Sequence, residues 1–267
     1  MIAALRQPHC GRVAWITGST SGIGWATARQ LASEGAAIAL HGSKAASATT
    51  DAQLAELHTM GVAARYYALD LADGEAIAPL ARRIAAELGE IDILVNNAGM
   101  QHVQSVLQFP AEKWNTMLAV NLSAPFHSIQ ACVPAMLARG WGRIINMASV
   151  SALVGVANKP AYVASKHGLL GLTKSVALEL ATTPVTCNAI CPGWVLTPLV
   201  QKQVDAKAAA QGISNEEATR RLLGEKEPSM QFTTPEELGE LAVFFCSAAG
   251  NNVRGVAWNM DGGWTAQ

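Results

Sequence analysis

Short apolar runs alternate along the chain with longer segments in which apolar residues recur every three or four positions. Seven apolar runs, rich in β-branched residues, predict strands over residues 12–18, 36–42, 62–71, 91–99, 142–149, 185–193 and 255–263. Helical spacing predicts helices over residues 25–35, 51–61 and 73–90. Strands that alternate with helices, and that contain few polar residues, predict a parallel sheet covered by helices on both faces.

Composition narrows the class of protein. The chain has 267 residues, of which 50% are hydrophobic and 15% charged, against about 25% charged in an average domain. This size suits a single domain over residues 1–267. The net charge of −1 gives no reason to expect a nucleic acid or a membrane as partner. We expect neither a signal peptide nor a membrane span, and therefore a cytoplasmic protein.

The cysteines argue against a metal site. The five are Cys10, Cys132, Cys187, Cys191 and Cys246. Cys187 and Cys191 are the closest pair, but no second pair and no suitably placed histidine completes a zinc site. We predict buried, reduced thiols and no metal.

A glycine-rich loop, TGSTSGIG, follows the first predicted strand and precedes the first helix. Glycines at 18, 22 and 24 allow the backbone to turn sharply and to approach a pyrophosphate, which the helix N-terminus favours. The spacing differs from the usual Gly-x-Gly-x-x-Gly, and a tight structural turn is the alternative interpretation. The position between strand and helix favours a dinucleotide site.

This Thr-Gly-x-x-x-Gly-x-Gly spacing resembles the cofactor loop of the short-chain dehydrogenase/reductase family. The resemblance implies a Rossmann fold, a doubly wound parallel seven-stranded sheet, and a nicotinamide dinucleotide. The residues that it implies for cofactor binding are Gly18, Thr20, Ser21, Gly22, Ile23, Gly24, Asp70, Leu71, Asn97, Ala98, Gly99, Tyr162, Lys166, Pro192, Gly193, Val195 and Thr197. Without it, Asp70 or Asp73 would be a helix N-cap and NNAG, at 96–99, only a turn.

The end of the second strand does not decide between the two nicotinamide cofactors. An acidic residue there commonly binds the ribose of NAD, and an arginine accommodates the extra phosphate of NADP. The segment ALHGSKAAS has neither, although Lys44 is a possible phosphate partner. The resemblance implies NAD.

Three residues form a candidate catalytic set. Tyr162 and Lys166 are four positions apart, which places them on one face of a helix, and Ser149 follows the fifth strand. An ammonium within about 4–6 Å of a phenol lowers its pKa and prepares it to exchange a proton with an alcohol. The tyrosine–lysine spacing alone is common on solvated helices, so the serine strengthens the hypothesis.

The family resemblance adds Asn121 and assigns roles. It implies hydride transfer between an alcohol carbon and the nicotinamide, with Tyr162 moving the proton and Ser149 holding the oxygen. Lys166 would lower the pKa of Tyr162 and bind the ribose. Asn121, in AVNLSAPF, would mark a helix kink and anchor a water; its alternative is a mid-helix polar residue.

The substrate end is indicated first by Lys159, which precedes Pro160 and therefore lies on the loop entering the catalytic helix. A cation there favours an anionic substrate, unless Lys159 is an ordinary solvated lysine. Longer stretches, such as ANKPAYVASKHG and DGGWTAQ, resemble family members that act on small hydroxy or keto acids. That resemblance implies substrate binding by Gln101, Ser149, Ser151, Lys159, Tyr162, Trp194, Gln203 and Trp264.

One position departs from those relatives, which commonly carry histidine where this chain has Ser151. Losing one hydrogen bond to a charged group costs about 1.5–3 kcal/mol, so another small acid is an alternative substrate. The two tryptophans would otherwise be core or interface residues. Two further alternatives are an NADPH-dependent reductase of 3-oxoacyl thioesters and a non-catalytic dinucleotide-binding protein.

The last predicted feature is a helical lid over residues 198–228, interrupted at Gly212 and restarted by a capping box of Ser214 and Glu217. The lid would close on the substrate and exclude water. The resemblance also implies a homotetramer, packed through the helices that carry Asn121 and Tyr162 and through the last strand.

Overall fold

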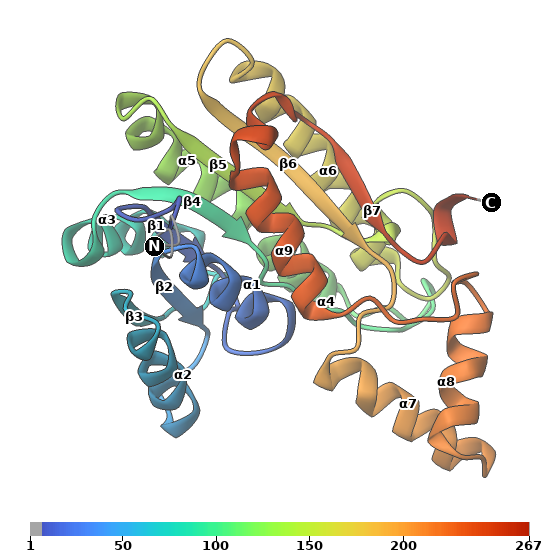
Figure 1. Ribbon diagram of the computed structural model, residues 1–267. Helices are drawn as coiled ribbons and strands as arrows, with labels where there is room; N and C mark the ends of the chain where they lie inside the picture. Colours follow the sequence, from blue (N-terminus) through green and yellow to red (C-terminus); the bar gives the residue numbers. More distant parts are fainter. Residues whose placement is uncertain (1–6, 267) are drawn as a thin grey trace.

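The computed structural model describes residues 7–266 and contains one sheet of seven parallel strands (Figure 1). The strands are Val13–Ile16 (β1), Ala37–Gly42 (β2), Ala64–Ala68 (β3), Ile91–Asn96 (β4), Gly142–Met147 (β5), Val185–Pro192 (β6) and Ala257–Met260 (β7). Their order in the sheet is β3-β2-β1-β4-β5-β6-β7, and every neighbouring pair is parallel. The predicted Rossmann arrangement is confirmed.

Helices cover both faces of the sheet (Figure 1). One face carries α1 (Gly22–Ser33), α2 (Ala48–Thr59) and α9 (Pro235–Cys246), and the other α3 (Ile77–Leu88), α5 (Ala124–Ala138) and α6 (Pro160–Glu179). Consecutive strand residues alternate between the two cores: Ile16 packs in the first and Trp15 in the second. Burial of such side chains contributes about 1.5–3 kcal/mol each, so this alternation fixes the strand register.

The predicted boundaries need correction at both kinds of element. Strands were predicted too long at their carboxyl ends: β3 ends at Ala68 and β4 at Asn96, because the following residues turn away to line a cleft. The first two helices begin three residues earlier than predicted, and α3 begins later, at Ile77, because a 3₁₀ turn precedes it. Ser47 caps α2 in a reciprocal pair with Thr50, and Asp73 caps a short 3₁₀ turn before α3.

Two helices project from the carboxyl edge of the sheet, α7 (Pro198–Gln211) and α8 (Asn215–Gly224) (Figure 1). The predicted interruption is confirmed, because Gly212 ends α7 in the left-handed region at φ 62°. Ser214 caps α8 through the Glu217 N–H, but the Glu217 carboxylate pairs with Arg220 and Arg221 and does not return the bond. Closure of this unit stays a prediction.

The cysteines are free throughout residues 7–266. The prediction of buried thiols is confirmed for four, and it is wrong for Cys10, which lies exposed in the turn before β1. No cluster of three potential metal ligands occurs in the same range.

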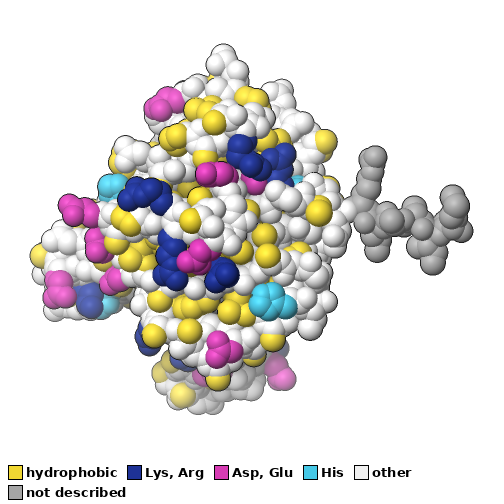
Figure 2. Space-filling model, turned by 90° about the vertical axis from the view of Figure 1, so that its left-hand side faces the viewer, with side chains coloured by type: hydrophobic (Ala, Val, Ile, Leu, Met, Phe, Trp, Pro, Cys, Tyr) yellow, Lys and Arg dark blue, Asp and Glu magenta, His cyan; other side chains and the backbone are white. Residues whose placement is uncertain are grey.

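The surface on one side of the molecule shows basic and acidic side chains interspersed with apolar ones (Figure 2). Among the described helices, each is too short or too polar to cross a lipid bilayer.

The remaining helix is α4 (Ala111–Leu118). It leads through five π-helical residues into α5.

Candidate active site

A cleft of about 750 Å³ opens where the strands end. This edge is where open α/β sheets bind ligands. Every residue predicted to bind cofactor or substrate lines the cleft except Gly24. Of the predicted catalytic residues, Ser149, Tyr162 and Lys166 line it and Asn121 does not.

The glycine loop forms one wall. Gly18 and Gly22 adopt positive φ angles of 61° and 52°, which other residues rarely tolerate. A Cβ on Gly24 would lie 2.6 Å from the carbonyl oxygen of Gly18, so Gly24 allows helix and loop to pack closely rather than touching the ligand. Ser21 precedes α1 without capping it through its side chain, which leaves the first N–H groups of the helix available to a phosphate. These features fit a dinucleotide.

The segment after β4 holds this loop in place. Asn97 donates from its side-chain nitrogen to the carbonyls of Thr17 and Gly18, each at 2.9 Å. The Thr17 hydroxyl accepts from the N–H groups of Asn97 and Ala98, at 2.9 and 3.0 Å. The segment therefore does more than turn the chain: its polar groups tie β1 and β4 together beneath the glycines.

His41, at the end of β2, was not singled out in the sequence, although strand ends are where function is expected. The Gly18 N–H donates to Nδ1 of its ring at 3.1 Å, so Nε2 must carry the hydrogen, which it donates to the Leu69 carbonyl, also at 3.1 Å. Burial lowers the pKa of His41 to about 4, consistent with a neutral ring. His41 thus links the glycine loop to the segment that contains Asp70.

Asp70 and Asp73, the two predicted candidates for a helix cap, have different positions. Asp70 lines the cleft, and its carboxylate also accepts from the N–H of Ala72 at 3.0 Å. Asp73 is the residue that caps the following 3₁₀ turn. The helix-cap interpretation therefore applies to Asp73, and Asp70 faces the cleft.

The candidate catalytic residues converge from α6 and from the end of β5. The Lys166 ammonium lies 5.7 Å from the centre of the Tyr162 ring and donates to the Met147 carbonyl at 2.7 Å. Ser149 follows β5, and its hydroxyl accepts from the Ser151 N–H at 3.1 Å. The structure brings the three together, with Lys166 buried.

The electrostatics of the pair differ from the prediction. In the protein alone, burial raises the pKa of Tyr162, and the hydrogen bond from Ser149 offsets this only in part. Burial also lowers the pKa of Lys166 to about 8. The expected net lowering of the Tyr162 pKa is thus wrong for the chain without its ligands, because desolvation of the phenol has the largest effect.

Asn121 lies behind the cleft. It is buried within a π-helical segment, Ala119–Ser123, so the predicted distortion of the helix is confirmed. Its side chain accepts from the Met100 N–H and donates to the Met100 carbonyl, both at 2.9 Å, and donates to Ser165 at 3.2 Å. Asn121 therefore fixes the loop after β4 against α6; its binding of a water stays a prediction.

The opposite end of the cleft carries one cation and two tryptophans. Lys159 precedes α6, Pro160 is the first helical residue, and the Lys159 ammonium lies 5.6 Å from the Trp194 ring centre. Lys159 is half-buried with its pKa lowered by desolvation, so it is not an ordinary solvated lysine. Trp194 and Trp264 face each other with ring centres 6.4 Å apart. They line the cleft and do not belong to the main core.

Four further polar residues that were predicted to bind substrate or cofactor also line the cleft. Gln101 and Gln203 line the cleft beside Lys159, and no carboxylate in residues 7–266 pairs with that lysine. The Thr197 hydroxyl caps α7 through the Val200 N–H at 3.4 Å, a second task beside its predicted cofactor contact. Ser151 is buried and lines the cleft.

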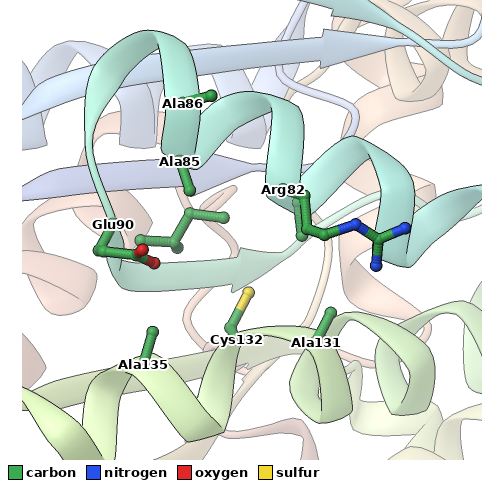
Figure 3. A pocket seen from close by; sticks show the side chains of 9 residues that line it. Arg82, Ala85, Ala86, Glu90, Ala131, Cys132 and Ala135 are labelled. Atoms are coloured by element: carbon green, nitrogen blue, oxygen red, sulfur yellow. The ribbon is translucent and has the colours of Figure 1, made fainter.

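A second cavity, of about 340 Å³, lies between α3 and α5 (Figure 3). Its walls are mostly alanine side chains, with Arg82 and Glu90 near its edges and Cys132 projecting from α5 (Figure 3). Burial raises the pKa of Cys132, which keeps the thiol protonated and unreactive. The cavity thus lacks the converging reactive groups of the larger cleft.

Known proteins resemble the whole chain. The family model described as short chain dehydrogenase matches residues 12–208. D-beta-hydroxybutyrate dehydrogenase of Cupriavidus necator is 52% identical over 259 residues, covering 96% of this chain and 99% of that protein. The protein of the same name from Rhizobium meliloti is 45% identical, with the same coverage. L-Sorbose reductase from Gluconobacter frateurii, solved with NADPH and L-sorbose, is 32% identical with a TM-score of 0.91 over 97% of this chain and 98% of that one.

The family model matches well over half of the chain, and the two dehydrogenases are similar to it over nearly their full length. From this agreement we conclude that the chain belongs to the short chain dehydrogenase family, whose members are oxidoreductases.

Proposed function

We propose that the protein is an NAD-dependent dehydrogenase that interconverts D-3-hydroxybutyrate and acetoacetate. The observation that carries this proposal is one cleft lined by a proton-transfer set and, on its tryptophan side, by Lys159, which has no acidic partner in residues 7–266. A short molecule with an alcohol at one end and a carboxylate at the other matches that arrangement. The similarity to two D-beta-hydroxybutyrate dehydrogenases supports the same substrate.

In the proposed mechanism Tyr162 removes the proton of the substrate hydroxyl during oxidation and returns it during reduction. Ser149 donates a hydrogen bond to the same oxygen and keeps it beside the phenol. Lys166 lies one helical turn beyond Tyr162, and its positive charge favours the phenolate once the cleft is closed. The nicotinamide, when bound, supplies the acceptor or donor of the hydride.

The carboxylate of the substrate would be held by Lys159 with Gln101 and Gln203. Trp194 and Trp264 would form an apolar wall that limits the length of the substrate. Because Gln203 lies on α7, closure of the 198–228 lid would complete the carboxylate site and exclude water. Removal of water strengthens each of these charge-assisted bonds.

NAD is the proposed cofactor. The ring of His41, at the strand end that contacts the ribose in this fold, is neutral and uses both nitrogens within the protein, so it offers no charge to a 2′-phosphate. Lys44 is exposed in the adjacent loop and is the nearest alternative cation. Solved relatives contain NADPH or NADP, so the test compares both cofactors.

The test is spectrophotometric. Purified protein with NAD and D-3-hydroxybutyrate should produce NADH, followed by its absorbance, and the L-enantiomer and NADP should give much slower rates. No turnover with this pair, but turnover with another hydroxy acid or with NADP, would overturn the specific proposal and leave the family assignment intact.

Ser151 supports a second candidate, a dehydrogenase of another small hydroxy acid. Its short side chain is buried at the cleft wall and provides less reach and no charge compared with a histidine. A panel of 3-hydroxy acids of increasing length, compared by kcat/KM, distinguishes the two candidates.

A homotetramer is proposed from the helices that carry Asn121 and Tyr162. Their outer faces expose apolar side chains, including Phe126 on α5 and Leu178, 77% exposed, on α6, and β7 exposes Trp258. Contiguous exposed apolar patches mark protein–protein interaction sites, and these faces are the proposed contacts between subunits. Light scattering coupled to size exclusion gives the mass directly.

A further inference from the structure

Two buried carboxylates lie behind the tryptophan wall. Glu227 follows α8, and Asp261 follows β7, so the two come from segments far apart in sequence. Both side chains are buried, and neither forms an ion pair within residues 7–266. Buried carboxylates are costly unless they accept hydrogen bonds or carry a proton, so their partners indicate what they do.

Glu227 holds the chain at Trp194. Its Oε1 accepts a hydrogen bond from the Trp194 N–H, and its Oε2 has no partner among the described residues. The preceding residue, Gly193, lies between the two acids, and there is no room for a side chain at this position. An added Cβ would collide with the Glu227 carboxylate and lie 2.9 Å from the Asp261 Cα. The first tryptophan of the wall is thus fixed from behind.

Asp261 holds the second tryptophan in the same way. Its Oδ1 accepts from the Gly263 N–H at 3.1 Å, and its Oδ2 accepts from the Thr265 N–H at 2.9 Å. These two groups flank Trp264, which begins a short 3₁₀ turn at the C-terminus. The rings of Trp194 and Trp264 are then 6.4 Å apart on the cleft side.

The two acids influence each other. Burial, and then the negative charge of Asp261, raise the pKa of Glu227 to about 7, although the bond from Trp194 opposes this. The other charged groups near the wall are cations on the ring faces: Lys159 lies 5.6 Å from the Trp194 ring centre, and Lys226 lies 6.0 Å from that of Trp264.

We propose that Glu227 and Asp261 are positioning residues that set the tryptophan wall of the substrate pocket. Glu227 accepts from the Trp194 N–H, and Asp261 accepts from the N–H groups on either side of Trp264. The inference rests on the proposed function only for the identity of the substrate that the wall meets. It adds a layer behind the wall that touches neither substrate nor cofactor.

The experiment compares Glu227→Gln with Glu227→Ala, using Glu240→Gln as the matched control. Glutamine keeps an acceptor oxygen for the Trp194 N–H, whereas alanine removes it; Glu240 is an exposed acid on α9, outside the lid. We expect Glu227→Ala to raise KM for the hydroxy acid about tenfold, the effect of one lost hydrogen bond and a shifted wall, with kcat changed less than about threefold. KM for NAD should not change in any of the three.

Glu227→Gln should retain the KM of the wild type. An equal rise in KM for Gln and Ala would overturn the role of Glu227 as acceptor for Trp194, and an unchanged KM for Ala would overturn the positioning role. Asp261→Asn, which keeps one acceptor oxygen of two, should raise KM by a smaller factor than Glu227→Ala.

A crystal structure of Glu227→Ala separates this inference from the proposed function. Displacement of the Trp194 indole is expected even if the enzyme prefers a different acid, and an unmoved indole overturns the inference whatever the substrate. If the alanine variant fails to fold, the Asp261→Asn structure and its Trp264 position provide the same decision.

Discussion

The two ends of the cleft are built from the same sheet edge but differ in how their polar groups are satisfied. At the cofactor end, Thr17, His41 and Asn97 are bonded to neighbouring backbone. At the substrate end, Lys159 has no acidic partner in the described chain, and one oxygen of Glu227 has none either. The side chains that support the cofactor end are bonded within the protein before any ligand arrives, whereas the charged side chain of the substrate end is not.

This difference has a physical reason. A pyrophosphate is bound by backbone N–H groups, which must be held rigidly by the surrounding hydrogen bonds if they are to point at one place. A small acid would be bound here by long side chains, on the loop before α6 and on α7. Such a site needs side chains that are not already paired within the protein. The following predictions test this contrast, beginning with the residue between the two ends.

Tyr162→Phe should have the largest effect. Removal of the hydroxyl abolishes proton transfer, so kcat should fall about 10²–10⁴-fold while the Kd of NADH, measured by fluorescence, stays unchanged. Tyr67→Phe is the control, because the Tyr67 hydroxyl bonds to Glu87 outside the cleft. A kcat close to that of wild type in Tyr162→Phe would show that another group moves the proton.

Lys159→Ala tests the substrate end. Loss of a charge-assisted hydrogen bond of about 1.5–3 kcal/mol should raise KM for the hydroxy acid about tenfold to a hundredfold and leave KM for NAD unchanged. Steady-state kinetics in both substrates measures this. A loss confined to kcat, with KM preserved, would contradict a carboxylate-binding role.

His41→Leu tests the cofactor end. The Gly18 N–H and the Leu69 carbonyl would lose their partners, and each such bond contributes about 0.5–1.5 kcal/mol, so the Kd of NADH should rise about tenfold. His41→Asn can still accept from Gly18 and should restore part of the affinity. If KM for the hydroxy acid rises as much as the Kd of NADH, the two ends are not independent.

The smallest effect concerns stability against pH. The pKa of Glu227 is raised from 4.5 to about 7 on folding, so its protonated form stabilises the fold fully below pH 4.5, and this contribution is lost as the pH rises through about 7. Relative to Glu227→Gln, the Tm of the wild type should fall by a few degrees over that interval. Parallel Tm curves in scanning calorimetry would show that Glu227 does not titrate there.

Much of the fold could be predicted because its signals are local. Apolar runs, the glycine loop and the spacing of Tyr162 and Lys166 each depend on a few neighbouring residues, and the sheet follows from their alternation. Gly212 ends its helix as expected, since a left-handed residue at that point favours glycine.

The remainder depends on contacts between distant segments. His41 bonds to Gly18 and Leu69, and Glu227 bonds to Trp194. These partners lie more than twenty residues apart in sequence, so no local pattern reveals them. The pKa of Tyr162 was predicted from its charged neighbour alone, whereas burial, which no spacing reveals, has the larger effect. The helix distortion at Asn121 was predicted correctly. Its position behind the cleft was not, because that position depends on contacts with the loop after β4 and with α6.

His41 also offers a spectroscopic consequence. The chain has six histidines, and the ring of His41 is fixed as the Nε2–H tautomer and resists protonation down to a pH of about 4. Its ¹⁵N resonances should therefore keep the pattern of that tautomer across neutral and mildly acidic solution. Nuclear magnetic resonance of one imidazole would then report when a dinucleotide displaces or tightens the glycine loop, without any label on the ligand.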